Sequence, residues 1–113
     1  MEYLTSDDFM SYGDYNYQQK VILLRIFERY HQEVKRIKIS KIPLPLGAKY
    51  LSRFPFVFMV ENAFRNCCEE TQQIITKDFI EPQKGKWYAK EMSAATYYRR
   101  RANAYEEFVT ELF

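Results

Sequence analysis

Residues 16–38 carry a helical pattern of apolar side chains that limits the folds open to this chain. Leu23, Phe27, Tyr30, Val34 and Ile37 follow one another at alternating steps of four and three residues, which places them on one side of an α-helix. Most lysines and arginines of the segment fall off this stripe. A long helix with one apolar side has to bury that side, so the sequence predicts a helix over 16–38 whose stripe faces a core.

The same stripe leaves a second use open. Apolar residues spaced by four and three also form the seam of a coiled coil, but two heptads are short for a stable zipper. Burial within the chain is therefore the preferred interpretation. A homodimer through helix 16–38 stays as the alternative.

Glycine and proline are scarce, and most of them stand together. The 113 residues include only three glycines and four prolines, which disfavours a β-sandwich, because that fold needs a turn every few residues. Pro43, Pro45, Gly47 and Pro55 interrupt regular structure after the long helix. The segment between them is short and apolar, so we expect a connector that packs onto its neighbours.

The remainder of the chain predicts further helices and no strand. Glu69 and Glu70 suit the first turn of a helix, and Ser93 is a favoured N-cap residue. The helices expected after the connector cover residues 56–66, about 69–80, 87–92 and 94–113, with a loop at 81–86. The predicted fold class is all-α, a long N-terminal helix plus a C-terminal helical bundle.

Two parts are expected within one compact domain. Residues 1–55 comprise an acidic N-terminal segment, the long helix and the proline-rich connector, and residues 56–113 form the C-terminal helical unit. A chain of this length is the size of one domain.

Charge is concentrated in two basic segments. The whole chain has a net charge of +2, but residues 84–101 contain six lysines or arginines and one glutamate, and residues 20–41 contain seven and two. The net negative charge lies mainly in residues 1–19 and 102–113. A local basic surface in a nearly neutral protein indicates an anionic partner that is met at one place.

The stretch WYAKEMSAATYYRRR, residues 87–101, joins a short helix to a capped long one, which is typical of a helix-turn-helix. Its second helix would enter the major groove of DNA. The small side chains at its start permit close approach, Arg99 is placed to read a guanine edge, and the other cations are expected at phosphates. The residues expected at double-stranded DNA are Lys84, Lys86, Lys90, Ala95, Thr96, Tyr98, Arg99, Arg100 and Arg101. Trp87 and Tyr97 are expected in the core, and Tyr98 at the surface.

The same residues resemble a known family. The pattern is WY, a short gap, S-x-x-T-Y-Y-R, then an alanine and an aromatic residue, and it is similar to the helix-turn-helix of region four of bacterial sigma factors. The resemblance is stronger to sigma-like phage regulators of the ArpU type and covers about residues 57–113. It implies transcription control through DNA, in a bacterium or phage, with RNA polymerase as a further partner. The matching residues are Trp87, Tyr88, Ser93, Thr96, Tyr97, Tyr98, Arg99, Ala104 and Phe108.

Other classes of function find little support in the sequence. One histidine, and no glycine-rich phosphate loop or nucleophile elbow, leave no catalytic constellation, so no enzyme and no cofactor are expected. Cys67 and Cys68 are adjacent and lack metal-site spacing; they are expected to be buried free thiols in a reducing cytoplasm. No signal peptide or membrane span is expected. A helical protein-interaction module, such as an adaptor that binds RNA polymerase without DNA, remains the alternative function.

Overall fold

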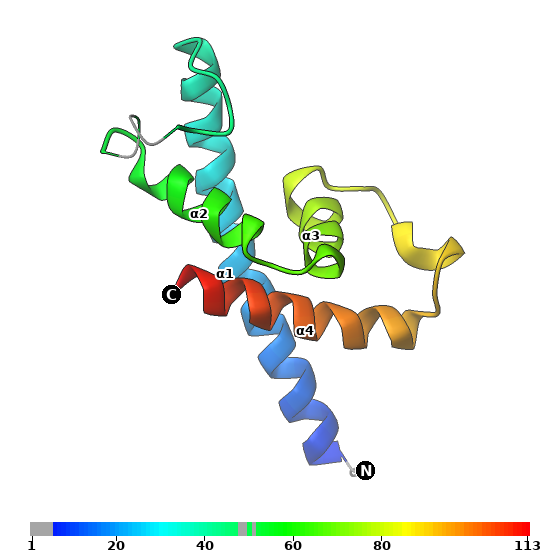
Figure 1. Cartoon of the computed structure of the whole chain (residues 1–113). Helices are drawn as coiled ribbons and strands as arrows, with labels where there is room; N and C mark the ends of the chain where they lie inside the picture. The colour runs from blue at the N-terminus through cyan, green and yellow to red at the C-terminus, as the bar shows by residue number, and fades with distance from the viewer. Residues whose placement is uncertain (1–5, 48–49, 51) are drawn as a thin grey trace.

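The structure is a computed structural model that describes residues 6–47, 50 and 52–113, with side chains from residue 17 onward. Every element in this part of the chain is helical, which confirms the all-α fold class (Figure 1). The first five residues of the predicted acidic segment lie outside the described residues. The elements are α1 Ser6–Ile39, α2 Pro55–Arg65, α3 Glu69–Ile75, the π-helical turn η2 Thr76–Ile80, the 3-10 turn η3 Trp87–Lys90, and α4 Ala94–Leu112.

Helix α1 is longer than the predicted 16–38, because it begins at Ser6. Residues 6–15 contain no proline and only one glycine, so nothing in them stops the helix. The helix ends in a Schellman motif. Lys41 takes a left-handed conformation with φ of 62°, its N–H donates to the Lys38 carbonyl, and the Ile42 N–H donates to the Ile37 carbonyl at 3.2 Å.

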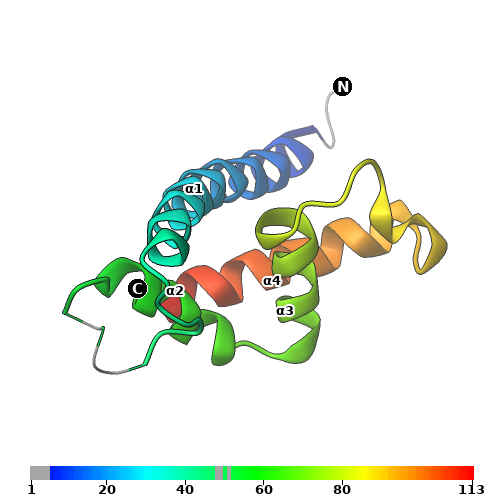
Figure 2. The same cartoon turned by 90° about the horizontal axis from the view of Figure 1, so that it is seen from above.

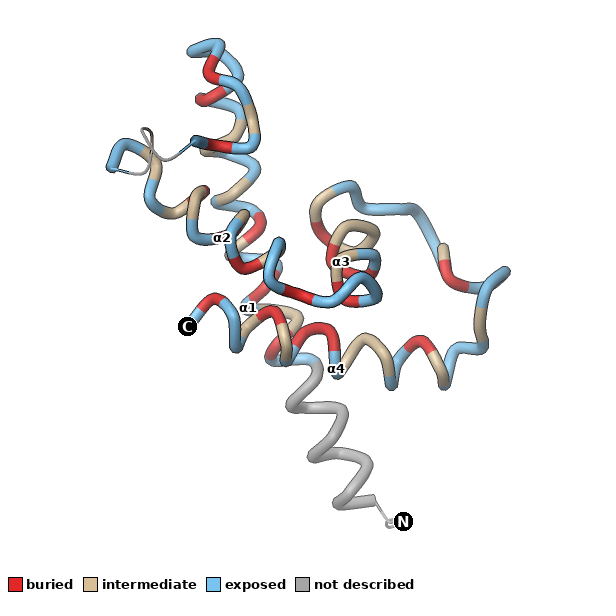
Figure 3. The backbone as a smooth tube through the Cα atoms, viewed as in Figure 1, coloured by how far each residue is buried: buried red, intermediate tan, exposed pale blue. Residues whose placement is uncertain are grey.

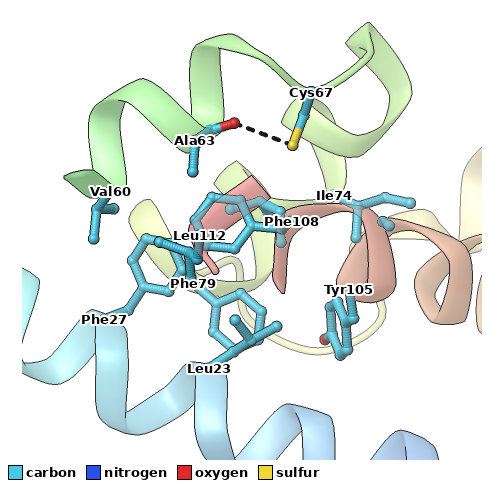
Figure 4. Close-up of a cluster of buried hydrophobic side chains, with 12 residues drawn as sticks. Leu23, Phe27, Val60, Ala63, Cys67, Ile74, Phe79, Tyr105, Phe108 and Leu112 are labelled. Atoms are coloured by element: carbon cyan, nitrogen blue, oxygen red, sulfur yellow. Dashed lines mark hydrogen bonds between the residues drawn. The ribbon is translucent and has the colours of Figure 1, made fainter. Parts of the chain in front are cut away.

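The core forms where α4 crosses α1 and packs on α2 and α3 (Figures 1 and 2). Phe27 of α1 lies 5.3 Å from Phe79 and 5.5 Å from Phe108, measured between ring centroids (Figure 4). Leu23 and Phe27 are buried among residues of α2, α3, η2 and α4. The prediction that the stripe of the long helix faces a core is confirmed, and these side chains are not available to a second copy.

A second apolar cluster holds the connector. Ile42 and Leu46 are buried together with Ile37 of α1 and Val57 of α2. The Leu46 N–H also donates to the Glu61 carboxylate at 3.0 Å. The connector packs onto its neighbours, as expected from its short apolar sequence.

The predicted helix over 69–80 has its expected length, but its last turn is wider than an α-helix. In η2 the Glu81 N–H donates to the Thr76 carbonyl at 2.7 Å. The turn carries Phe79 into the core and Asp78 toward α4. π-helical turns of this kind often mark functional positions.

The two cysteines are free, but only one of them is buried. The Cys67 thiol donates to the Ala63 carbonyl at 3.3 Å (Figure 4). Cys68 is exposed because it stands at the N-cap of α3, outside the core. The expectation that both thiols are buried is wrong for Cys68.

Candidate nucleic-acid interface

Helix α4 begins with the predicted cap. Ser93 is extended, with φ of −72° and ψ of 161°, and its Oγ accepts the Thr96 N–H at 3.2 Å. The predicted helix over 87–92 is shorter than expected, since only one 3-10 turn forms over Trp87–Lys90. The N–H groups of Glu91 and Met92 both donate to the Tyr88 carbonyl and close the turn into α4.

One carboxylate ties the start of α4 to the rest of the molecule. Asp78 Oδ2 accepts the hydroxyl of Tyr97 at 2.7 Å and that of Tyr105 at 2.8 Å. Asp78 Oδ1 accepts the Trp87 indole N–H at 2.9 Å. Burial, and then the neighbouring Asp78, raises the pKa of both tyrosines well above the usual value. These phenols therefore stay protonated and act as donors.

Asp78, which accepts hydrogen bonds from three side chains, was not predicted from the sequence to have a role. A signal was present, because Asp78 stands four residues after Ile74 and three after Ile75. Those spacings place a carboxylate on the apolar side of a predicted helix. A carboxylate at such a position requires donors from another element.

Aromatic rings form the inner wall of this region. The rings of Tyr88 and Tyr97 stack with centroids 3.8 Å apart and planes 5° from parallel. Trp87 meets Tyr97 edge-on at 5.5 Å and is half-buried. Tyr97 is buried and Tyr98 exposed, as predicted, and Trp87 packs inside the chain.

The three consecutive arginines do not form one surface. Successive residues of an α-helix are turned by about 100°, so the three side chains leave α4 in different directions. Arg99 is exposed. Arg100 pairs with Glu70 of α3 at 3.4 Å, and Arg101 lies over the ring of Tyr98 at 4.7 Å and that of Tyr105 at 5.4 Å.

The remaining predicted site residues also differ in their exposure to solvent. Ala95 and Arg99 are exposed and four residues apart, so they share the outer side of α4. Thr96 is half-buried beside the cap. Lys84, Lys86 and Lys90 are exposed in the loop and turn before α4, where Figure 3 shows a nearly continuous exposed trace. Among the described residues, these three lysines and Arg99 make no ion pair.

The acidic end of α4 supports the fold at a different place. Glu107 accepts the Thr71 hydroxyl at 2.6 Å and the Cys68 N–H at 3.1 Å. These bonds satisfy donors at the N-terminus of α3. The hydrogen bond from Thr71 holds the pKa of Glu107 below its usual value.

His31, the single histidine, also has a structural partner. Its Nε2 lies 2.8 Å from the Phe79 carbonyl, and because a carbonyl only accepts, this nitrogen carries the hydrogen. Among the described residues, no three His, Cys, Asp or Glu side chains come close enough together to hold a metal ion.

Comparisons with known protein families, with curated proteins and with solved structures find no match to this chain. Within the described part of the chain, none of the helices has both the length and the apolar character needed to cross a membrane.

Proposed function

We propose that this protein binds double-stranded DNA by placing the N-terminal half of α4 in the major groove. The observation that carries the proposal is the outer side of α4. Ala95 keeps it thin, and Arg99 stands on it exposed and without an ion pair among the described residues. An arginine at such a position can bond a guanine edge through two N–H groups.

The loop before α4 supplies the phosphate contacts in this proposal. Lys84, Lys86 and Lys90 are exposed beside the start of the helix. Cations on both sides of an inserted helix neutralise the DNA backbone and orient the helix. Together with the resemblance of residues 57–113 to sigma region four, this supports a role in transcription regulation, in which RNA polymerase is a further proposed partner.

The test is fluorescence anisotropy of the full chain with labelled duplex DNA of mixed sequence, at about 50 mM and about 200 mM salt. Phosphate-driven binding should weaken steeply between the two. On a duplex selected for tight binding, Arg99→Ala should cost about 1–3 kcal/mol if Arg99 reads a base. The matched control is Arg36→Ala, because Arg36 is also exposed but lies near the C-terminal end of α1, away from α4 (Figure 1).

Absence of binding at low salt would reject the proposal. Equal effects of Arg99→Ala and Arg36→Ala on the selected duplex would reject base reading by Arg99 while leaving phosphate-driven binding in place.

A second candidate function is a helical protein-interaction module. The observation in its favour is that Ile22 and Leu24 of α1 are 47% and 48% exposed, one on each side of the buried Leu23. A partner bound through such side chains would be held by apolar burial, which salt weakens little. The same two-salt comparison therefore separates the two functions.

A further inference from the structure

A pocket of about 260 Å³ lies where α1, η2, η3 and the start of α4 meet. Four cationic side chains line it, and they come from four different segments: Lys20, Lys77, Lys86 and Arg101. Lys20 belongs to α1, far from α4 in the sequence, and sequence reasoning gave it no role. The fold thus adds a cation of α1 to three cations of the C-terminal half.

The negatively charged group in the pocket already accepts hydrogen bonds. Asp78 is the single carboxylate among the lining residues, and its two oxygens accept three hydrogen bonds from Trp87, Tyr97 and Tyr105. Lys77 lies 3.6 Å from Glu91 outside the pocket.

The other three cations have no such partner. Lys20, Lys86 and Arg101 form no ion pair within the described part of the chain, and the buried Nε of Arg101 has no acceptor. Four cations and one carboxylate leave the lining of the pocket with excess positive charge, and like charges repel one another. An anion in the pocket would remove that repulsion.

The walls of the pocket are aromatic. The aromatic residues that line it are Trp87, Tyr88, Tyr97 and Tyr98, and Tyr98 is 43% exposed. An exposed aromatic ring next to cations is the arrangement by which proteins stack a nucleic-acid base and hold its phosphate. The volume lies below the range of about 300–1,000 Å³ typical of drug-sized ligands, so the pocket suits one nucleotide unit or less.

We propose that this pocket binds the phosphate group of a nucleotide, either free or within a nucleic-acid strand. Lys20, Lys86 and Arg101 face the phosphate oxygens, and Tyr98 offers its ring to the base. The pocket does not depend on insertion of α4 into a groove, so this proposal stands or falls separately from the proposed function.

The chain contains its own reporter for this site, because Trp87 is its single tryptophan and lines the pocket. The full chain is titrated with adenosine monophosphate, with inorganic phosphate and with a short single-stranded DNA, and the fluorescence of Trp87 is followed. Each probe that binds should change the emission at low salt. Adenosine monophosphate should bind more tightly than inorganic phosphate, because only the nucleotide has a base to stack.

Two variants test the assigned contacts. Lys20→Ala should weaken phosphate binding about fivefold, as expected for one partly exposed charge contact. Lys35→Ala is the matched control, because Lys35 is an exposed lysine of the same helix and does not line the pocket. Tyr98→Ala should weaken adenosine monophosphate about fivefold or more and leave inorganic phosphate unchanged, because only the stacking contact is lost.

The probes distinguish the two sources of the phosphate. A response to adenosine monophosphate that Lys20→Ala weakens identifies a free nucleotide, and a response to DNA alone that the same change weakens identifies a strand. The proposal is overturned if none of the three probes changes the fluorescence emission of Trp87. It is also overturned if Lys20→Ala and Lys35→Ala change binding equally. In that case the proposed function would still stand if Arg99→Ala weakens binding to duplex DNA. Conversely, phosphate binding without duplex binding would reject the proposed function and leave the pocket proposal in place.

Discussion

Replacement of Asp78 by alanine should destabilise this protein more than most single changes outside the apolar core. The Asp78 carboxylate accepts hydrogen bonds from Trp87, Tyr97 and Tyr105 at 2.7–2.9 Å. Tyr105 is 0% exposed and Tyr97 is 5% exposed, so both hydroxyls lose an acceptor in a place where water has little access. In the Asp78→Ala variant both phenols become buried donors without partners.

The expected loss in the free energy of unfolding follows from those two hydroxyls. Each buried donor left without an acceptor costs about 1–3 kcal/mol, so the two together cost about 2–6 kcal/mol. The half-buried Trp87 indole adds little, because water can reach it. Since domains of this size have unfolding free energies of about 5–15 kcal/mol, the variant should fold only marginally.

The assay is urea unfolding followed by far-ultraviolet circular dichroism, on the wild type, Asp78→Ala, Tyr105→Phe and the double variant. Tyr105→Phe removes one donor with little change in shape, so the double-mutant cycle isolates that hydrogen bond. A hydrogen bond to a charged group contributes about 1.5–3 kcal/mol, and the cycle should show a coupling of this order. Asp78→Asn is the control, because its amide retains one acceptor oxygen and should cost less than alanine.

Additive effects of Asp78→Ala and Tyr105→Phe, within about 0.5 kcal/mol, would refute the reasoning. A loss below about 0.5 kcal/mol for Asp78→Ala alone would do the same, because that is the range of an ordinary surface substitution.

Three further substitutions and one labelling experiment test local features of the structure. Ser93→Ala removes the cap of α4 and should lower the free energy of unfolding by about 1 kcal/mol. Lys41→Gly should raise it by up to about 1 kcal/mol, because glycine relieves the cost of the left-handed conformation, roughly 1–2 kcal/mol, and loses about 0.5–1 kcal/mol of chain entropy. Urea unfolding measures both. Burial raises the pKa of the Cys67 thiol to about 12, so a thiol reagent at neutral pH should label Cys68 in the native protein and Cys67 only after unfolding, as mass spectrometry would show. The lowered pKa of Glu107 stabilises the fold above the usual carboxyl pKa of about 4.3, and this contribution is lost as pH falls through the lower folded value. Glu107→Gln should therefore flatten the fall of the unfolding free energy with acid.

Each of these has an outcome that would contradict it. Unchanged stability of Ser93→Ala would mean that the cap contributes nothing, and a less stable Lys41→Gly would mean that the end of α1 is not strained. Equal labelling of both cysteines would place Cys67 outside the core. If the unfolding free energy of Glu107→Gln falls with acid as steeply as that of the wild type, the Glu107 carboxylate does not stabilise the fold.

Local sequence patterns were sufficient for the helices and for the side of each that faces the core. The stripe containing Leu23 and Phe27 has a helical period, Ser93 is a favoured cap, and both properties depend only on neighbouring residues. Tyr97 and Tyr98 were assigned correctly, because Tyr97 shares the apolar side of the helix with Ala104 and Phe108 and Tyr98 is turned about 100° from it. The divergence of the three arginines follows from the same geometry, but which one pairs and which one turns inward does not.

The widened turn at 76–80 and the partners of Asp78, Glu107 and Arg101 were settled only by tertiary structure. Each of these depends on residues far apart in the chain, such as Asp78 with Tyr105 or Lys20 with Arg101, and a periodic pattern shows which side of a helix is apolar without showing what it meets. The basic pocket is the clearest case. Three of its four cations lie between residues 77 and 101, and the crossing of α1 and α4 adds Lys20 to them.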